Sequence, residues 1–165
     1  MAVINLTELA GGLAREARLI GIDPGGRRVG VALSDVGRRI ATPYATLPRT
    51  PLAALAVELV TVAQREGASG LVIGLPLEMD GRRGPAAQAA RDFAHALSAA
   101  TGLPAALVDE RLTTASAERA MIAADVSRAK RAARIDAAAA AILQTALDRL
   151  AEMDRQDTGQ DTGRA

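Results

Sequence analysis

The chain contains no cysteine, no tryptophan, a single histidine and only two other aromatic residues, Tyr44 and Phe93. Without cysteine there can be no disulfide, no thiolate metal site and no cysteine nucleophile. A zinc site needs several nitrogen or sulfur ligands, so His95 cannot build one and is expected to have a surface or packing role. With so few aromatic rings, base stacking cannot be the main way in which this chain would recognise nucleic acid.

A surplus of charge of either sign is also missing. Twenty basic residues face nineteen acidic ones, which gives a formal net charge of +1. This balance excludes a bulk polycation and leaves only local basic patches as an argument for a nucleic-acid partner. No apolar run approaches the roughly 18 residues of a membrane span, and the N-terminus does not resemble a signal peptide. We therefore expect a cytoplasmic protein without a membrane partner.

The 165 residues, of which 49% are hydrophobic, are enough for one domain with a core of Ala, Leu, Val and Ile. Residues 1–17 are interpreted as an N-terminal extension with a frayed start, because two glycines interrupt any helix there. The domain itself is expected over residues 18–152. The remaining residues, 153–165, are polar and are predicted to form a disordered tail.

The domain begins with a pattern typical of a β-hairpin. Leu19 to Ile22 form an apolar run that ends in Asp23, and Pro24-Gly25-Gly26 follows as a turn signal. Residues 28–34 then alternate between apolar and small or polar side chains, as a strand does. The first strand thus delivers Asp23 to its end, where a carboxylate either stabilises the turn or binds a ligand.

The rest of the chain alternates between strand and helix patterns. We predict a third strand over 39–47, a helix over 51–66, a strand over 71–74, a helix from Pro85 to Thr101, a strand over 105–110, a helix capped by Thr113 or Thr114, and a last helix over 131–153. This order, β-β-β-α-β-α-β-α-α, indicates an α/β fold with a mixed five-stranded sheet and helices on its faces.

Three carboxylates stand out in this arrangement. Glu110 ends a predicted strand, as Asp23 does, and strand ends at one edge of an α/β sheet form the usual ligand crevice. Asp109 and Glu110 are expected to point to opposite faces, so that only one reaches the crevice. Asp136 falls in the apolar stripe of the last helix. Because a buried carboxylate needs a partner, Asp136 either pairs with an arginine or shares a metal ion with Asp23 and Glu110.

A site of three carboxylates without cysteine would select a hard cation, Mg²⁺ or Mn²⁺. In a two-metal arrangement, Asp23 would bridge the ions while Glu110 and Asp136 complete their shells, and the metals would activate a water for attack on a phosphodiester. The spacing of the three acids alone favours a shared metal site and structural ion pairs with arginines equally.

Four motifs resemble the YqgF/RuvX family of RNase H-like nucleases. They are Gly21-x-Asp23-x-Gly25-x-x-Arg28-x-Gly30-Val31-Ala32, Gly74-Leu75-Pro76-Leu77-x-Met79-Asp80-Gly81, Asp109-Glu110-Arg111-Leu112-Thr113-Thr114, and Ile135-Asp136-x-x-Ala139-Ala140-x-Ile142-Leu143. The resemblance covers about residues 18–150. It implies an RNase H-like fold and a metal-dependent nuclease that processes the 5′ end of the 16S ribosomal RNA precursor. Holliday-junction resolution is the older proposal for the family.

In this resemblance Asp23, Glu110 and Asp136 fall on the three acidic positions of the family. Glu78 departs from the family pattern, which usually has asparagine there, and this leaves the substrate contact of that loop in doubt. Arg28, Arg83 and Arg111 flank the expected crevice and are our candidates for phosphate contacts, because a guanidinium matches phosphate geometry.

Other functions stay open at this point. One is a nucleic-acid-binding module without catalysis. Another is an ATP-binding protein of the actin and sugar-kinase class, whose phosphate loop the first hairpin also resembles, although those proteins use two domains and this chain has one. The choice between RNA and DNA, the mode of cutting, the role of Asp109 and the oligomeric state, monomer or homodimer, are not predicted. Ribosomal particles are a further expected partner.

Overall fold

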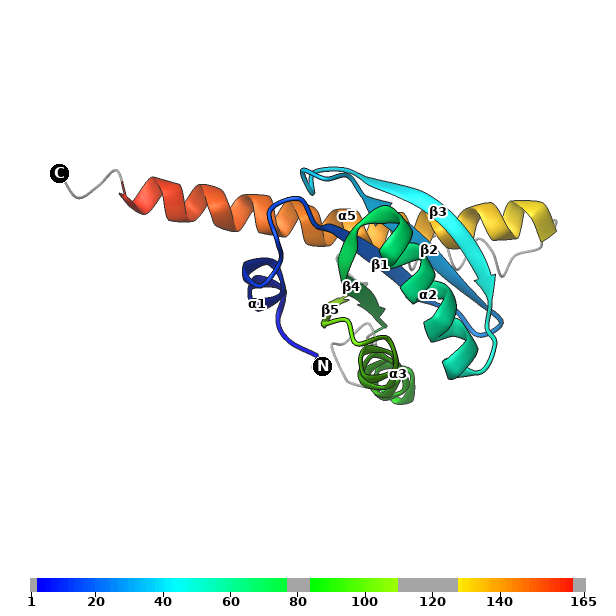
Figure 1. Cartoon of the computed structure of the whole chain (residues 1–165). Helices are drawn as coiled ribbons and strands as arrows, with labels where there is room; N and C mark the ends of the chain where they lie inside the picture. The colour runs from blue at the N-terminus through cyan, green and yellow to red at the C-terminus, as the bar shows by residue number, and fades with distance from the viewer. Residues whose placement is uncertain (1–2, 77–83, 110–127, 162–165) are drawn as a thin grey trace.

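The computed structural model describes residues 3–76, 84–109 and 128–161. The elements are α1 (Leu6–Gly11), β1 (Arg18–Pro24), β2 (Arg28–Ser34), β3 (Ala41–Pro48), α2 (Leu52–Glu66), β4 (Ala68–Leu75), α3 (Pro85–Thr101), β5 (Ala105–Asp109) and α5 (Arg128–Asp161). The helix predicted to follow Thr113 or Thr114 lies outside the described residues. Figure 1 shows the elements in their places around one twisted sheet.

The five strands form one mixed sheet in the order β3-β2-β1-β4-β5. The first three strands pair in an antiparallel manner, and β1–β4 and β4–β5 pair in parallel. This is the RNase H-like arrangement predicted from the sequence. Because β1, β4 and β5 run in parallel, their carboxyl ends meet at one edge of the sheet, the place where α/β proteins bind ligands.

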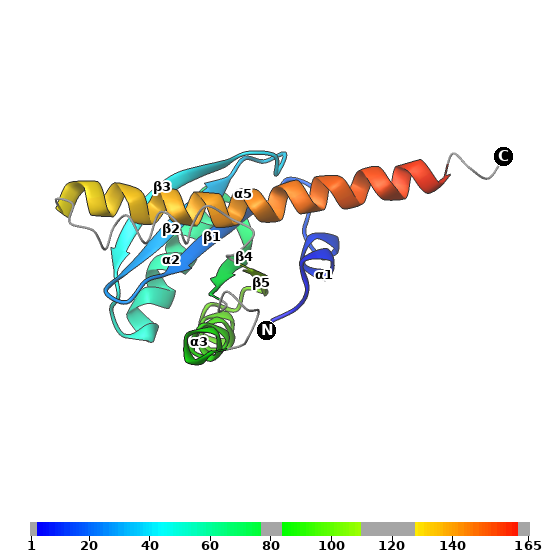
Figure 2. The same ribbon diagram turned by 180° about the vertical axis from the view of Figure 1, so that it is seen from behind.

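Helices cover both faces of the sheet. The long helix α5 lies across one face, and α2 and α3 pack on the other (Figures 1 and 2). Alternate strand residues serve the two layers, because successive side chains in a strand point to opposite faces. On β1, Ile20 and Ile22 join the core under α2 and α3, whereas Leu19 joins the core under α5.

Glycines end the two helices on the first face. Gly67 and Gly102 have positive φ angles of 70° and 72°, and their N–H groups donate to the carbonyls of Ala63 and Ser98. This left-handed conformation suits glycine and satisfies a carbonyl of the last turn. Both helix ends agree with the predictions from the sequence.

The β2–β3 turn explains why β3 begins at Ala41, two residues later than predicted. The carboxylate of Asp35 accepts hydrogen bonds from the backbone N–H groups of Arg39, at 2.7 Å, and Ile40, at 3.0 Å. Those amides are thereby used in the turn instead of the strand. The same two hydrogen bonds lower the pKa of the Asp35 carboxyl, and the bond from Ile40 has the larger effect.

The N-terminal segment packs against the domain, which corrects the predicted frayed start. Leu6 and Leu9 of α1 are buried in the core under α5, and the N–H of Ile4 donates to the carbonyl of Ala105 on β5 at 2.8 Å. Arg38 adds hydrogen bonds from its guanidinium to two carbonyls of residues 14–17. The glycines do end the helix, since α1 stops at Gly11 with Gly12 as its cap, but apolar contacts with a distant helix keep the short helix in place.

Helix α5 continues to Asp161, beyond the predicted end near Met153 and into the segment expected to be disordered. Residues 151–159 are exposed along this extension, which projects past the sheet and α1 (Figure 1). The residues after Leu150 include strong helix formers, so the helix propagates from its packed part without further burial. Within the described ranges, no helix is both long and apolar enough to cross a membrane.

Candidate active site

Asp23 lies at the carboxyl end of β1 and is only 1% exposed. It is opposite Gly30 of β2 in the antiparallel pairing. Strand alternation places it on the same face as Leu19 and Gly21, the face that α5 covers. A carboxylate buried at this edge lies where the sequence predicted either a turn-stabilising acid or a metal ligand.

The turn after Asp23 is held tightly. The N–H of Gly25 donates to the carbonyl of Asp23 at 2.9 Å, and a Cβ atom at Gly25 would lie 2.5 Å from the carbonyl oxygen of Arg28. Only glycine fits that approach. Arg49, which follows β3, donates from Nη1 to the carbonyl of Gly25 at 2.7 Å and from its backbone N–H to the carbonyl of Arg27 at 3.0 Å. Sequence reasoning did not single out Arg49.

Two glycines of the hairpin let α5 lie directly on the sheet. A Cβ atom at Gly30 would collide with the carbonyl oxygen of Ile135 and lie 2.8 Å from its carbonyl carbon. A Cβ atom at Gly21 would lie 2.6 Å from Cβ of Leu143 and 2.9 Å from the carbonyl oxygen of Ala139. Asp136 follows Ile135 immediately. The close contact therefore brings Asp136 to the end of the hairpin that carries Asp23.

Asp136 is half-buried on α5, near the fully buried positions Ala139 and Leu143. Burial raises the pKa of its carboxyl, and a hydrogen bond from the backbone N–H of Ala137 acts in the opposite direction with a smaller effect. The ion pairs found among the described side chains join Glu66 to Arg18 and Arg65, and neither includes Asp136. The described arginines thus do not supply the structural ion pair that was the alternative interpretation.

The third predicted acid, Glu110, and the predicted phosphate contacts Arg83 and Arg111 lie outside the described residues. Within the described ranges, no group of three His, Cys, Asp or Glu side chains comes together. A site of three carboxylates therefore stays a prediction. Asp109 is paired with Leu75 at the end of β4. Strand alternation places Asp109 on the face of Leu107, which is opposite the face of α5.

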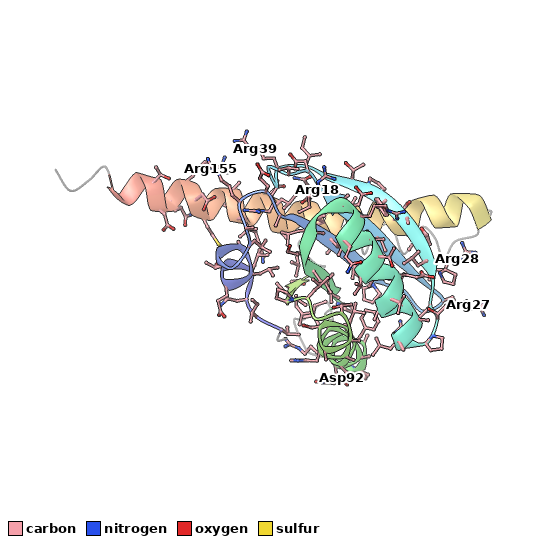
Figure 3. All side chains as sticks on the ribbon, in the orientation of Figure 1. Arg18, Arg27, Arg28, Arg39, Asp92 and Arg155 are labelled. Carbon is pink, nitrogen blue, oxygen red and sulfur yellow. The ribbon has the colours of Figure 1, made fainter. Side chains whose placement is uncertain are left out.

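Arg28 begins β2 and is partly exposed. Figure 3 shows Arg27 and Arg28 at the end of the molecule where α5 starts, whereas Arg155 lies at the other end of the sheet. A cation in this position suits a nucleic-acid backbone that reaches Asp23. His95 is exposed on α3, which agrees with the predicted surface role.

Both the family model and the named relatives describe nucleases, and their descriptions name different substrates. A family model described as "RuvX: Holliday junction resolvase" matches residues 17–149. A protein of Acidiphilium cryptum named "Putative pre-16S rRNA nuclease" is 60% identical over 153 residues, which cover 92% of this chain and 97% of that protein. A protein of Gluconacetobacter diazotrophicus with the same name is 49% identical over 92% of this chain and its own full length.

Among solved structures, Thermus thermophilus RuvC in complex with a Holliday junction substrate is similar with a TM-score of 0.46 and 16% identity. The match covers 81% of this chain and 96% of that protein. The assignment of the fold rests on the strand order and helix layers described above.

Proposed function

The chain belongs to the RuvX family and is a hydrolase of phosphodiester bonds, and on that premise we propose that it is a metal-dependent nuclease for the 5′ end of the 16S ribosomal RNA precursor. One observation supports the proposal: α5 packs on the hairpin so closely that Ile135, the neighbour of Asp136, touches Gly30, the pairing partner of the buried Asp23. Precursor RNA is preferred to junction DNA because of the names of the two relatives. This substrate implies ribosomal particles as partners and a place in the cytoplasm.

The described part of the site fits a divalent cation. Asp23 is buried at a strand end, and burial disfavours the charge of Asp136, so a cation nearby would stabilise both carboxylates. Carboxylate oxygens are ligands of hard cations, Mg²⁺ and Mn²⁺. We propose Asp23, Asp136 and Glu110 as the ligands. When bound, such a cation supplies activation of a water molecule and neutralisation of charge on the phosphodiester.

The residues of the chain have separate tasks in this mechanism. The backbone of Asp23 is fixed by its pairing with Gly30 and by the turn that Arg49 holds, which keeps this acid at the end of β1. Asp136 is placed by α5. The proposed role of Arg28, with Arg83 and Arg111, is to bind backbone phosphates through their guanidinium groups. No amino-acid nucleophile is required.

The direct test of the substrate uses purified protein with Mg²⁺ and two labelled substrates. One is an RNA that spans the 5′ end of the 16S precursor, and the other is a four-way DNA junction. We expect cleavage of the RNA at a defined position and at least about tenfold slower cleavage of the junction. Preferential cleavage of the junction would instead support the older proposal for the family, and binding without cleavage of either would support the binding-module alternative.

Replacement of Arg28 by alanine tests the phosphate contact. Binding that releases counterions weakens linearly on a plot of log K against log salt concentration. We expect Arg28→Ala to bind all sequences more weakly and to lower the slope by about one unit, because one phosphate contact is lost. The control is Arg155→Ala, an exposed arginine at the other end of the sheet (Figure 3), which should leave the slope unchanged. Equal slopes for all three proteins would remove Arg28 from the nucleic-acid interface.

A further inference from the structure

A cavity of about 330 Å³ lies beside the turn that follows Asp23. The turn residues 24–26 form one wall, and Pro76, which follows β4, lies next to them. The opposite wall is the first half of α3, with Ala86, Ala89 and Phe93, and Arg49 borders the cavity. This volume is at the lower end of the range for small-molecule sites. Pro24 connects the cavity directly to Asp23.

Arg49 and Phe93, which both line this cavity, form a cation–π pair. The guanidinium carbon of Arg49 lies 5.1 Å from the centre of the Phe93 ring. The hydrogen bond from Nη1 to the carbonyl of Gly25 fixes the guanidinium at the same time. Phe93 is half-buried and Arg49 is exposed, so the planar guanidinium is the more accessible member of the pair. Such a plane is a surface on which nucleic-acid bases stack.

Phe93 is the only phenylalanine of the chain, and Tyr44 is engaged elsewhere. The hydroxyl of Tyr44 donates to Glu66 at 3.1 Å and accepts a hydrogen bond from Arg65 at 2.9 Å. The Phe93 ring thus lies in a cavity at the turn that follows Asp23, on the α3 side of the sheet. This arrangement allows one base contact in a protein that otherwise has few means of stacking.

We propose that this cavity binds one nucleobase of a single-stranded substrate, close to the phosphodiester that is cut at Asp23. The base would stack on the guanidinium of Arg49 and lie against the alanine face of α3. The lining favours a base over a phosphate group, because Arg49 is its only charged residue and already donates to Gly25, and because the other side chains that line it are those of alanine, proline and phenylalanine. This inference rests on the proposed nuclease function and adds a contact to the base.

The test measures binding of a short single-stranded RNA by fluorescence anisotropy in the presence of a chelator, so that cleavage does not interfere. An abasic site replaces each nucleotide in turn. Ala89→Leu fills the cavity from an exposed helical position, and Ala100→Leu makes the same change on the same helix outside the cavity. Arg49→Lys keeps the positive charge and removes the planar surface.

We expect one abasic position to weaken binding to the wild-type protein and to Ala100→Leu by about tenfold, as the loss of one stacked base does. Ala89→Leu and Arg49→Lys should bind the intact RNA about tenfold more weakly and be insensitive to that abasic site. The proposal is overturned if Ala89→Leu binds like Ala100→Leu, or if every protein responds equally to each abasic site. If the base-binding proposal is overturned in either way but the wild-type protein cleaves RNA, the proposed nuclease function stands. If the wild-type protein neither binds nor cleaves RNA, both the base-binding proposal and the nuclease function are contradicted.

Discussion

Asp136→Asn is expected to reduce cleavage to the background of the assay while the fold stays intact. Asparagine keeps the shape of the side chain and removes the charge that a divalent cation requires. The control is Asp154→Asn, an exposed acid further along the same helix, which should cleave at the wild-type rate. Near-wild-type turnover by Asp136→Asn, measured under saturating Mg²⁺, would remove Asp136 from the site.

The same variant should be more stable than wild type at neutral pH when metal is removed. Burial raises the pKa of Asp136, so the folded state binds more protons than the unfolded state at intermediate pH. Stability therefore falls as pH rises from the ordinary pKa of an aspartate through the raised value, and asparagine avoids this loss. Denaturant unfolding in a chelator should show the advantage of Asp136→Asn at pH 7 and its disappearance near pH 4. A variant that is less stable at pH 7 would contradict this interpretation of the carboxylate.

Gly30→Ala is expected to lower cleavage by about 100-fold, although Gly30 itself has no reactive group. The new methyl group would collide with the backbone of α5 at Ile135, so the helix that carries Asp136 must shift. A displacement of about 1 Å can reduce a rate by about 100-fold when it misplaces a catalytic group. Forcing a side chain into a packed contact also lowers the free energy of unfolding by about 1–3 kcal/mol.

The matched control is Gly11→Ala at the end of α1, outside the hairpin and outside the cavity described above. No atom lies within 4 Å of a Cβ atom built there, so the fold and the position of α5 should be unchanged. Cleavage rates at a temperature well below the unfolding transition separate a displaced acid from an unfolded protein. Equal rates for Gly30→Ala and the wild type would show that the position of Asp136 does not depend on this contact.

Local patterns were sufficient to predict most of the fold. The alternation over residues 28–34, the turn after Asp23 and the glycines after α2 and α3 are each signals within a few residues, and the structure confirms them. Local sequence patterns gave wrong predictions where contacts between distant segments determine the structure. Leu6 and Leu9 hold α1 in the core under α5, and the carboxylate of Asp35 takes two amides from the expected start of β3.

The candidate site was predicted only in part, for a similar reason. The apolar stripe of the last helix placed Asp136 near the sheet, and in the structure its neighbour Ile135 contacts Gly30, which pairs with Asp23. The glycine pattern indicated strands and turns, but it did not show that Gly21 and Gly30 make room for the helix backbone, because that contact joins segments more than 100 residues apart. Arg49 was missed since a basic residue after a proline carries no distinctive pattern.

Direct titration of Mn²⁺ into the metal-free protein by calorimetry tests the shared site of Asp23, Asp136 and Glu110. A common site predicts that Asp23→Asn, Asp136→Asn and Glu110→Gln each weaken Mn²⁺ binding, whereas Asp154→Asn binds as the wild type does. Because metal displaces protons from carboxylates, wild-type affinity should also fall on acidification. Unchanged Mn²⁺ affinity in all three variants, together with cleavage that resists a chelator, would contradict a metal-dependent mechanism at these carboxylates.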